Sequence, residues 1–163
     1  MILIALGGNL SSQHGMPALT LDAALRALAQ RGVAVVSVSP YYATPAWPDA
    51  SDPPFVNAVA HIHTALSPDV LMELLHATET AFGRVRSRRN APRTLDLDLL
   101  DYDGRVEQGP PVLPHPRIAE RAFVLVPLAD VAPDWIHPAT GQTVRSLIDA
   151  LPERQIERLT SRA

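Results

Sequence analysis

Hydrophobic and polar residues alternate with a period of two in three segments of the chain. Residues 33–44 and 55–64 are rich in β-branched residues, and residues 93–103 alternate leucine with aspartate. Side chains two residues apart share one face of a β-strand, so each segment predicts a strand. Residues 1–7 form a short, continuous apolar run before a glycine-rich turn, which predicts a fourth strand.

Two other segments place apolar residues at helical spacing. The first begins at Met16-Pro17 and ends before Gly32, and the second begins at Ser67-Pro68 and ends at Gly83. Shorter helices are expected within residues 113–123 and 143–151. The resulting order is strand, helix, two strands, helix and strand. This order predicts a ferredoxin-like α+β sandwich, with an antiparallel sheet covered by helices on one face.

A doubly wound parallel sheet is disfavoured, because no helix connects residues 33–44 to residues 55–64. A length of 163 residues suits one domain spanning residues 1–163, and 47% hydrophobic content is typical of a globular protein. A net charge of −3 predicts no bulk attraction to nucleic acid or anionic membranes. The absence of cysteine excludes disulfides and thiolate chemistry. No apolar run approaches the ~18 residues of a membrane span, so a cytoplasmic protein is expected.

The strand predicted at residues 93–103 carries unusual negative charge. Every second residue from Leu95 to Leu99 is leucine, and Asp96 and Asp98 occupy the opposite face. Their Cα atoms are expected to lie roughly 6.6 Å apart. The two like charges repel by roughly 2 kcal/mol at an effective dielectric constant near 20.

This aspartate pair has two interpretations. It can be the solvated face of a half-exposed strand, or it can bind a divalent cation such as Mg²⁺, which prefers carboxylate and phosphate oxygens. Asp101 and Asp103 are expected on the leucine face, outside any such site. The preceding loop holds five arginines between Arg84 and Arg93. That loop is either a solvated basic surface or a binding site for phosphates. Carboxylates beside arginines favour a polyphosphate site, and the chain has no Walker sequence.

Three weaker signals remain. His61 and His63 share a strand face, but no third metal ligand accompanies them in the sequence. Gly7-Gly8-Asn9 is more often a turn than a phosphate-binding loop. The segment from Thr44 to Pro54 contains four prolines and predicts a long, restricted loop with a functional role.

The segment "RNAPRTLDLDLL" at residues 89–100 resembles the signature of the 6-hydroxymethyl-7,8-dihydropterin pyrophosphokinase family. The resemblance covers nearly the whole chain and includes "ALGGNL", "YYATPAW", "FVNAV", "ETAFGRVR" and "LPHPRIAERAFVLVPLADVAP". It implies an α-β-α sandwich with ferredoxin-like topology around a mostly antiparallel sheet.

The resemblance also implies a role for individual residues. Two Mg²⁺ ions are expected at Asp96 and Asp98, with Arg84 and Arg93 as catalytic contacts to the triphosphate. The residues expected to bind the pterin are Thr44, Pro45, Phe55, Asn57 and Phe123. The residues expected to bind ATP are Glu79, Arg84, Arg93, His115 and Arg121.

The family resemblance implies transfer of pyrophosphate from ATP to a hydroxymethyl pterin, with release of AMP, in folate biosynthesis. The expected partners are these two small molecules, without nucleic acid or membrane, and the expected form is a monomer.

Two other functions stay open. A nucleic-acid-binding module would use the arginine loop, although aromatic residues make up only 5% of the chain. A two-metal phosphohydrolase would use the aspartate pair without any pterin.

Overall fold

The computed structural model describes residues 1–85, 91–152 and 155–160. Arg86, Arg88 and Arg89 of the predicted arginine loop lie outside these residues. The strands are β1 (Ile2–Gly8), β2 (Ala34–Val38), β3 (Tyr42–Thr44), β4 (Phe55–His63), β5 (Asp96–Tyr102) and β6 (Glu157–Arg158). The helices are α1 (Pro17–Ala29), α2 (Pro68–Ala81), the 3₁₀ helix η1 (Ile118–Glu120), α3 (Ala122–Val131) and α4 (Val144–Asp149).

The strands form one sheet in the order β5-β1-β4-β3-β6. Strand β2 lies off this path and pairs with β4, as β3 does. The pairings among these strands are antiparallel. The first strand therefore lies between the two strands that come last in the β-α-β-β-α-β order, as in a ferredoxin-like sheet. The predicted fold class is confirmed.

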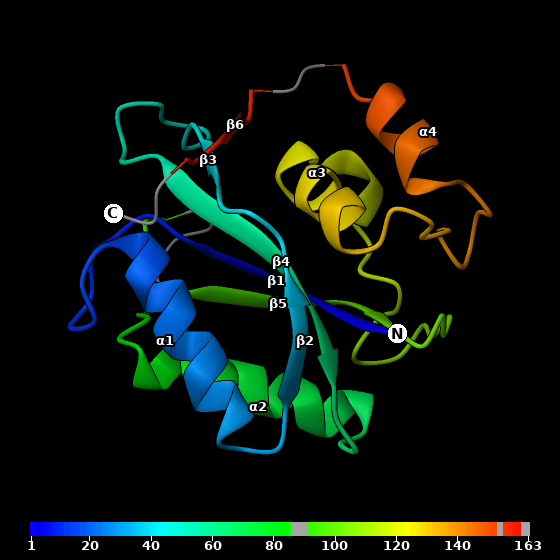
Figure 1. Ribbon diagram of the computed structural model, residues 1–163, viewed down its shortest axis with the longest axis horizontal. Coiled ribbons are helices and arrows are strands. Elements are labelled where there is room, and N and C mark those ends of the chain that lie inside the picture. Colours follow the sequence, from blue (N-terminus) through cyan, green and yellow to red (C-terminus); the bar gives the residue numbers. More distant parts are fainter. Residues whose placement is uncertain (86–90, 153–154, 161–163) are drawn as a thin grey trace.

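Helices cover both faces of the sheet (Figure 1). On one face, α1 and α2 pack on Ile4, Leu6, Leu97 and Leu99 in one hydrophobic cluster. On the other face, α3 and α4 pack in a second cluster that includes Leu3. The α-β-α arrangement agrees with the family resemblance, whereas the element order alone predicted helices on one face. No helix within the described ranges is long and apolar enough to cross a membrane.

The segment predicted as one strand at residues 33–44 forms two strands, β2 and β3. The prediction of a single continuous strand was therefore wrong. Between them the Ser39 N–H donates to the Val59 carbonyl, and the Val59 N–H donates to the Ser39 hydroxyl rather than to a backbone carbonyl. Pro40 follows and has no N–H to continue the ladder. The break frees β3 to run toward the end of β4 where Phe55 lies.

Helix α3 is longer than the short helix predicted within residues 113–123. The structure has η1 in that segment and then a ten-residue helix that runs on to Val131. Pro127 lies inside α3 and argues against a helix from sequence, because it lacks an N–H donor. Burial of Val124, Leu125 and Leu128 compensates for the missing hydrogen bond.

Strand β5 contains an extra residue that changes which side chains share a face. Ile4 of β1 pairs with Leu99, whereas its neighbour Leu3 pairs with Asp101, so Leu100 has no partner of its own in this register. A β-bulge of this kind places two residues of one strand opposite one residue of the other. The predicted alternation therefore holds up to Leu99 and breaks after it.

The bulge makes the predicted orientation of Asp101 wrong. The Asp101 side chain lies not on the leucine face but on the face of α3 and α4, where the Trp135 indole N–H donates to its Oδ2 at 2.7 Å. The Gly104 N–H donates to the other oxygen, Oδ1, at 2.9 Å. Only 4% of Asp101 is exposed. These contacts give Asp101 a role in the fold.

We expect Asp101→Asn to lower the free energy of unfolding by about 1–3 kcal/mol, because an amide oxygen replaces only one of the two carboxylate oxygens that accept from the Trp135 and Gly104 N–H groups. Urea denaturation followed by circular dichroism measures the change. Asp103→Asn is the control, since Asp103 is largely exposed and pairs with the N-terminal amine at the surface. Equal stability losses in the two variants would contradict this role of Asp101.

Candidate active site

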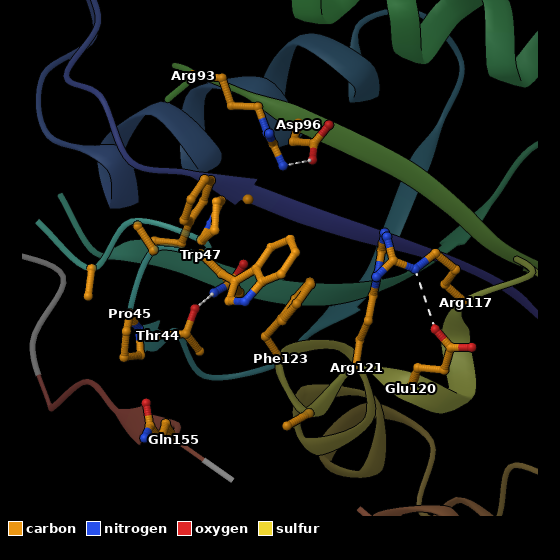
Figure 2. A pocket seen from close by; sticks show the side chains of 17 residues that line it. Thr44, Pro45, Trp47, Arg93, Asp96, Arg117, Glu120, Arg121, Phe123 and Gln155 are labelled. Carbon is orange, nitrogen blue, oxygen red and sulfur yellow. Dashed lines mark hydrogen bonds and ion pairs between the residues drawn. The ribbon is translucent and has the colours of Figure 1, made fainter. Parts of the chain in front are cut away.

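A cavity of about 470 Å³ opens where β1, β3, β4 and β5 meet the start of α3 (Figure 2). It is lined by Gly7, Thr44, Pro45, Ala46, Trp47, Pro48, Ala50, Phe55, Asn57, Arg93, Asp96, Arg117, Glu120, Arg121, Ala122, Phe123 and Gln155. All five residues predicted to bind the pterin belong to this set. The cavity therefore brings together side chains that are far apart in the sequence.

Asn57 lies in the wall of the cavity with its amide oriented by two neighbours. Its Nδ2 donates to the Thr44 hydroxyl at 2.9 Å. Its Oδ1 packs over Gly7, where a Cβ would lie 3.1 Å from that oxygen. The pairing of Gly7 with Asn57 across β1 and β4 produces this contact. Thr44 and Gly7 thus determine which polar groups of Asn57 face the cavity.

Asp96 lies at the start of β5 between two arginines. Its Oδ2 is 2.8 Å from Arg93 Nη2, and its Oδ1 contacts Arg84 Nη1. Burial alone would raise the pKa of Asp96, but Arg93 and Arg84 together hold this pKa below its usual value. The carboxylate is therefore ionised at neutral pH and aimed at cationic partners.

Arg84 also binds Glu79, the acid near the end of α2. The Arg84 Nη1 is 2.6 Å from Glu79 Oε1, and the Leu97 N–H donates to the same oxygen at 2.8 Å. Glu79 is 2% exposed and does not line the cavity. The structure thus places this carboxylate as a link between α2, Arg84 and β5. Its predicted contact with ATP stays a prediction.

Asp98 is paired with the residues predicted to bind the nucleotide. Its Oδ2 lies 3.4 Å from Arg121 Nη1 and 3.9 Å from His115 Nε2. Burial lowers the pKa of His115, and the positive charges of Arg121 and Arg117 lower it further, although Asp98 opposes the shift. A neutral imidazole is therefore favoured at neutral pH, so one ring nitrogen is a hydrogen-bond acceptor.

Two of the three arginines that bind Asp96 and Asp98 also lie over phenyl rings of the cavity. Arg93 Cζ is 5.0 Å from the centroid of Phe55, and Arg121 Cζ is 5.5 Å from that of Phe123. Both distances are within the range of a cation–π contact. Each aspartate is thereby connected through one arginine to one aromatic ring of the cavity.

The aspartates suit a hard divalent cation. Asp96 and Asp98 pair with Gly7 and Ala5 of β1, so both lie on one face of β5, with side chains 22% and 33% exposed. Carboxylate oxygens are ligands that Mg²⁺ prefers. Within residues 1–85, 91–152 and 155–160, no three His, Asp or Glu side chains converge as a metal site. A cation at this face would therefore need oxygen ligands besides the carboxylates of Asp96 and Asp98.

Trp47 is the largest cavity residue that the sequence analysis missed. It is 72% exposed and lies in the proline-rich loop, at the same cavity as Phe123 (Figure 2). A tryptophan among prolines in a polar loop was the signal that could have identified it. Arg117 and Glu120 were also missed, and they pair with each other at 3.4 Å beside the cavity.

Asp96→Asn should destabilise the fold, although it relieves the repulsion between Asp96 and Asp98. Replacing a carboxylate that binds two arginines should cost about 1.5–3 kcal/mol of unfolding free energy. Because the pKa of Asp96 is lowered in the folded state, this stabilisation is present above pH 3.8 and is lost as the pH falls below it. Urea denaturation at neutral and acidic pH tests this, and the two proteins should converge in stability at the acidic end. A more stable Asp96→Asn variant at pH 7 would contradict the ion-pair interpretation.

A solved structure confirms the architecture. The HPPK-DHPS of Plasmodium falciparum matches with a TM-score of 0.71 at 13% identity. The match covers 96% of this chain and 44% of that one. The chain thus spans less than half the length of that protein, and the likeness concerns the fold.

Sequence comparisons identify the family. The family described as 7,8-dihydro-6-hydroxymethylpterin-pyrophosphokinase matches residues 3–133. Proteins named 2-amino-4-hydroxy-6-hydroxymethyldihydropteridine pyrophosphokinase, from Methylorubrum extorquens and Pseudomonas aeruginosa, are each 42% identical to this chain over 157 and 159 residues. These alignments cover 96% and 97% of this chain and 96% of each relative. The chain therefore belongs to the 7,8-dihydro-6-hydroxymethylpterin-pyrophosphokinase family.

Proposed function

We propose that this protein transfers pyrophosphate from ATP to the hydroxymethyl group of 6-hydroxymethyl-7,8-dihydropterin, producing the pterin diphosphate and AMP for folate biosynthesis. Membership of the family supports this activity. One observation carries the assignment of the site: the acidic and basic groups Asp96 and Arg93 line the same cavity as Phe55 and Asn57. A phosphate-binding region and an aromatic pocket are therefore contiguous.

In the proposed reaction, the hydroxymethyl oxygen attacks the β-phosphorus of ATP. A new O–P bond forms while the bond from that phosphorus to the oxygen of the α-phosphate breaks, and AMP leaves. The hydroxyl proton passes to solvent. Positioning and electrostatic stabilisation provide most of the catalysis in reactions of this type. The chain's contribution is to hold the two substrates in line and to neutralise charge.

Asp96 and Asp98 are the proposed metal ligands. Two Mg²⁺ ions, the number implied by the family resemblance, would neutralise the charge that develops on the phosphates. Arg84 and Arg93 are the proposed contacts to the triphosphate. Arg84 keeps Glu79 as a partner when Asp96 is engaged elsewhere, so its guanidinium stays at the site.

The proposed pterin pocket lies between Phe55 and Phe123, with Thr44, Pro45 and Asn57 beside them. Aromatic faces provide stacking for a flat ring, worth roughly 0.5–1.5 kcal/mol per pair beyond burial. The amide of Asn57 both donates and accepts, as the edge of a pterin requires. Trp47 adds a further apolar wall from the proline-rich loop.

The proposed nucleotide contacts are His115 and Arg121, which lie on either side of Asp98. The neutral imidazole favoured at His115 is suited to a hydrogen bond with the nucleotide. Arg121 is suited to phosphate oxygens because its planar guanidinium donates several hydrogen bonds. The enzyme we propose is a monomer in the cytoplasm.

We expect Asp96→Asn and Asp98→Asn each to abolish Mg²⁺-dependent formation of AMP and pterin diphosphate while the fold is kept. The assay combines ATP and Mg²⁺ with and without the pterin and identifies the nucleotide product. Asp103→Asn is the matched control, because this aspartate is exposed and lies beyond the end of β5. ADP as the product, or phosphate release without pterin, would favour a phosphohydrolase instead.

Asn57→Ala should weaken pterin binding by on the order of 10-fold or more, as expected when a hydrogen-bonding partner in a buried site is lost. ATP binding should change little, because Asn57 lies on the aromatic side of the cavity. Calorimetric titration of each ligand separately tests this. Loss of affinity for both ligands would mean that the pocket is placed wrongly.

Steep, salt-dependent binding of RNA by the wild-type protein would support the nucleic-acid alternative.

A further inference from the structure

Asn9, just after β1, joins three segments that are far apart in the sequence. Its side-chain Oδ1 accepts from the Arg93 N–H at 2.8 Å, and its own N–H donates to the Arg93 carbonyl at 3.0 Å. Its Nδ2 donates to the Pro53 carbonyl at 2.9 Å. Asn9 is 4% exposed, so these contacts are shielded from water. Both the N–H and the carbonyl of Arg93 are therefore hydrogen-bonded to Asn9.

The glycine before Asn9 makes this docking possible. A Cβ on Gly8 would lie 2.4 Å from the Thr94 carbonyl oxygen, so any other residue would force the two segments apart. The Leu10 N–H also donates to the Arg93 carbonyl, at 3.2 Å. The N–H groups of Asn9 and Leu10 are thus occupied by protein. A phosphate-binding loop at this turn would need them free, so that interpretation is disfavoured.

The side chain of Arg93 extends from this anchored backbone into the site. Its Nη2 binds Asp96 at 2.8 Å, and its guanidinium lies over Phe55. Its Nε is buried and has no hydrogen-bond partner among the described residues. A buried N–H donor without a partner is costly and is available to an anionic ligand. The anchored backbone determines where this donor points.

We propose that Asn9 is a positioning residue for catalysis, acting through Arg93. It holds the Arg93 backbone against the end of β1 and, through Pro53, ties it to the loop that leads into Phe55. Asn9 thereby fixes the position of the phosphate side of the site relative to the aromatic side. This inference rests on the proposed role of Arg93 in the transfer reaction.

A double-mutant cycle tests the proposal, using Asn9→Ala, Arg93→Ala and the double variant. We expect Asn9→Ala to lower kcat on the order of 10- to 100-fold, as a misplaced catalytic group does. In the Arg93→Ala background the same change should alter kcat by less than about twofold, because its effect requires Arg93. A structural role alone would give equal losses in both backgrounds. If Asn9→Ala does not fold, Asn9→Asp, which keeps an acceptor but loses the donor to Pro53, replaces it in the cycle.

Thr64→Ala is the matched control. Thr64 is also a buried loop residue whose side chain joins separate segments, donating to the Gly32 carbonyl and accepting from the Leu66 N–H. It lies just beyond the other end of β4, away from the cavity. We expect it to lower the melting temperature but to leave kcat within about twofold of the wild-type value.

The outcomes separate the proposed role of Arg93 in the transfer reaction from the positioning role of Asn9. If Arg93→Ala itself leaves kcat unchanged, the proposed role of Arg93 is wrong. If Arg93→Ala lowers kcat but Asn9→Ala does not, or if the two losses multiply, the positioning role of Asn9 is overturned. The positioning role is supported if Asn9→Ala lowers kcat in the wild-type background but lowers it no further in the Arg93→Ala background. Thr64→Ala must also leave kcat unchanged.

Discussion

The pairing of Asp96 with two arginines is the interaction on which the site is built. Arg84 follows α2 and Arg93 precedes β5, so one carboxylate joins the ends of two secondary-structure elements. Glu79 adds a second anion to Arg84 and accepts a backbone N–H of β5. Because these groups are largely buried, each is strongly dependent on its partners. The result is a connected set of charges that fixes the start of β5 against α2.

The same charges connect the polar and aromatic halves of the cavity. An arginine bound to each aspartate also lies over a phenyl ring, so the two halves share these arginines. In the reaction proposed above, an incoming polyphosphate would compete with Asp96 and Asp98 for the guanidinium groups of Arg93 and Arg121. A flat ligand would compete with the same guanidinium groups for the ring faces. The two proposed substrates would therefore meet the same pair of side chains from different directions.

The sequence predicted what depends on neighbours along the chain. The alternation of leucine and aspartate is local, and it placed Asp96 and Asp98 on one face correctly. The bulge at Leu100 depends on pairing with β1, so the orientation of Asp101 could not be read from β5 alone. Helix α3 was underestimated because Pro127 disfavours a helix that tertiary burial nevertheless stabilises.

The charge partners inside the site were harder to predict than its members. Cavity residues such as Phe55, Asn57 and Phe123 came from family resemblance, and the structure brings them together. That Asp96 would be neutralised by Arg84 and Arg93 required their positions in three dimensions. The contacts of Asn9 were hidden for the same reason, since its partners lie 44 and 84 residues away along the chain.

The proline-rich loop has a thermodynamic consequence for ligand recognition. Four prolines between Thr44 and Pro54 restrict the backbone of the segment that carries Trp47 to the cavity. Each proline in a compatible position removes conformational freedom worth about 0.4–1 kcal/mol from the flexible state. A loop of ordinary composition would lose that freedom when a ligand binds. In this loop the prolines have already removed part of that freedom, so a ligand that contacts Trp47 would keep more of its contact energy for affinity.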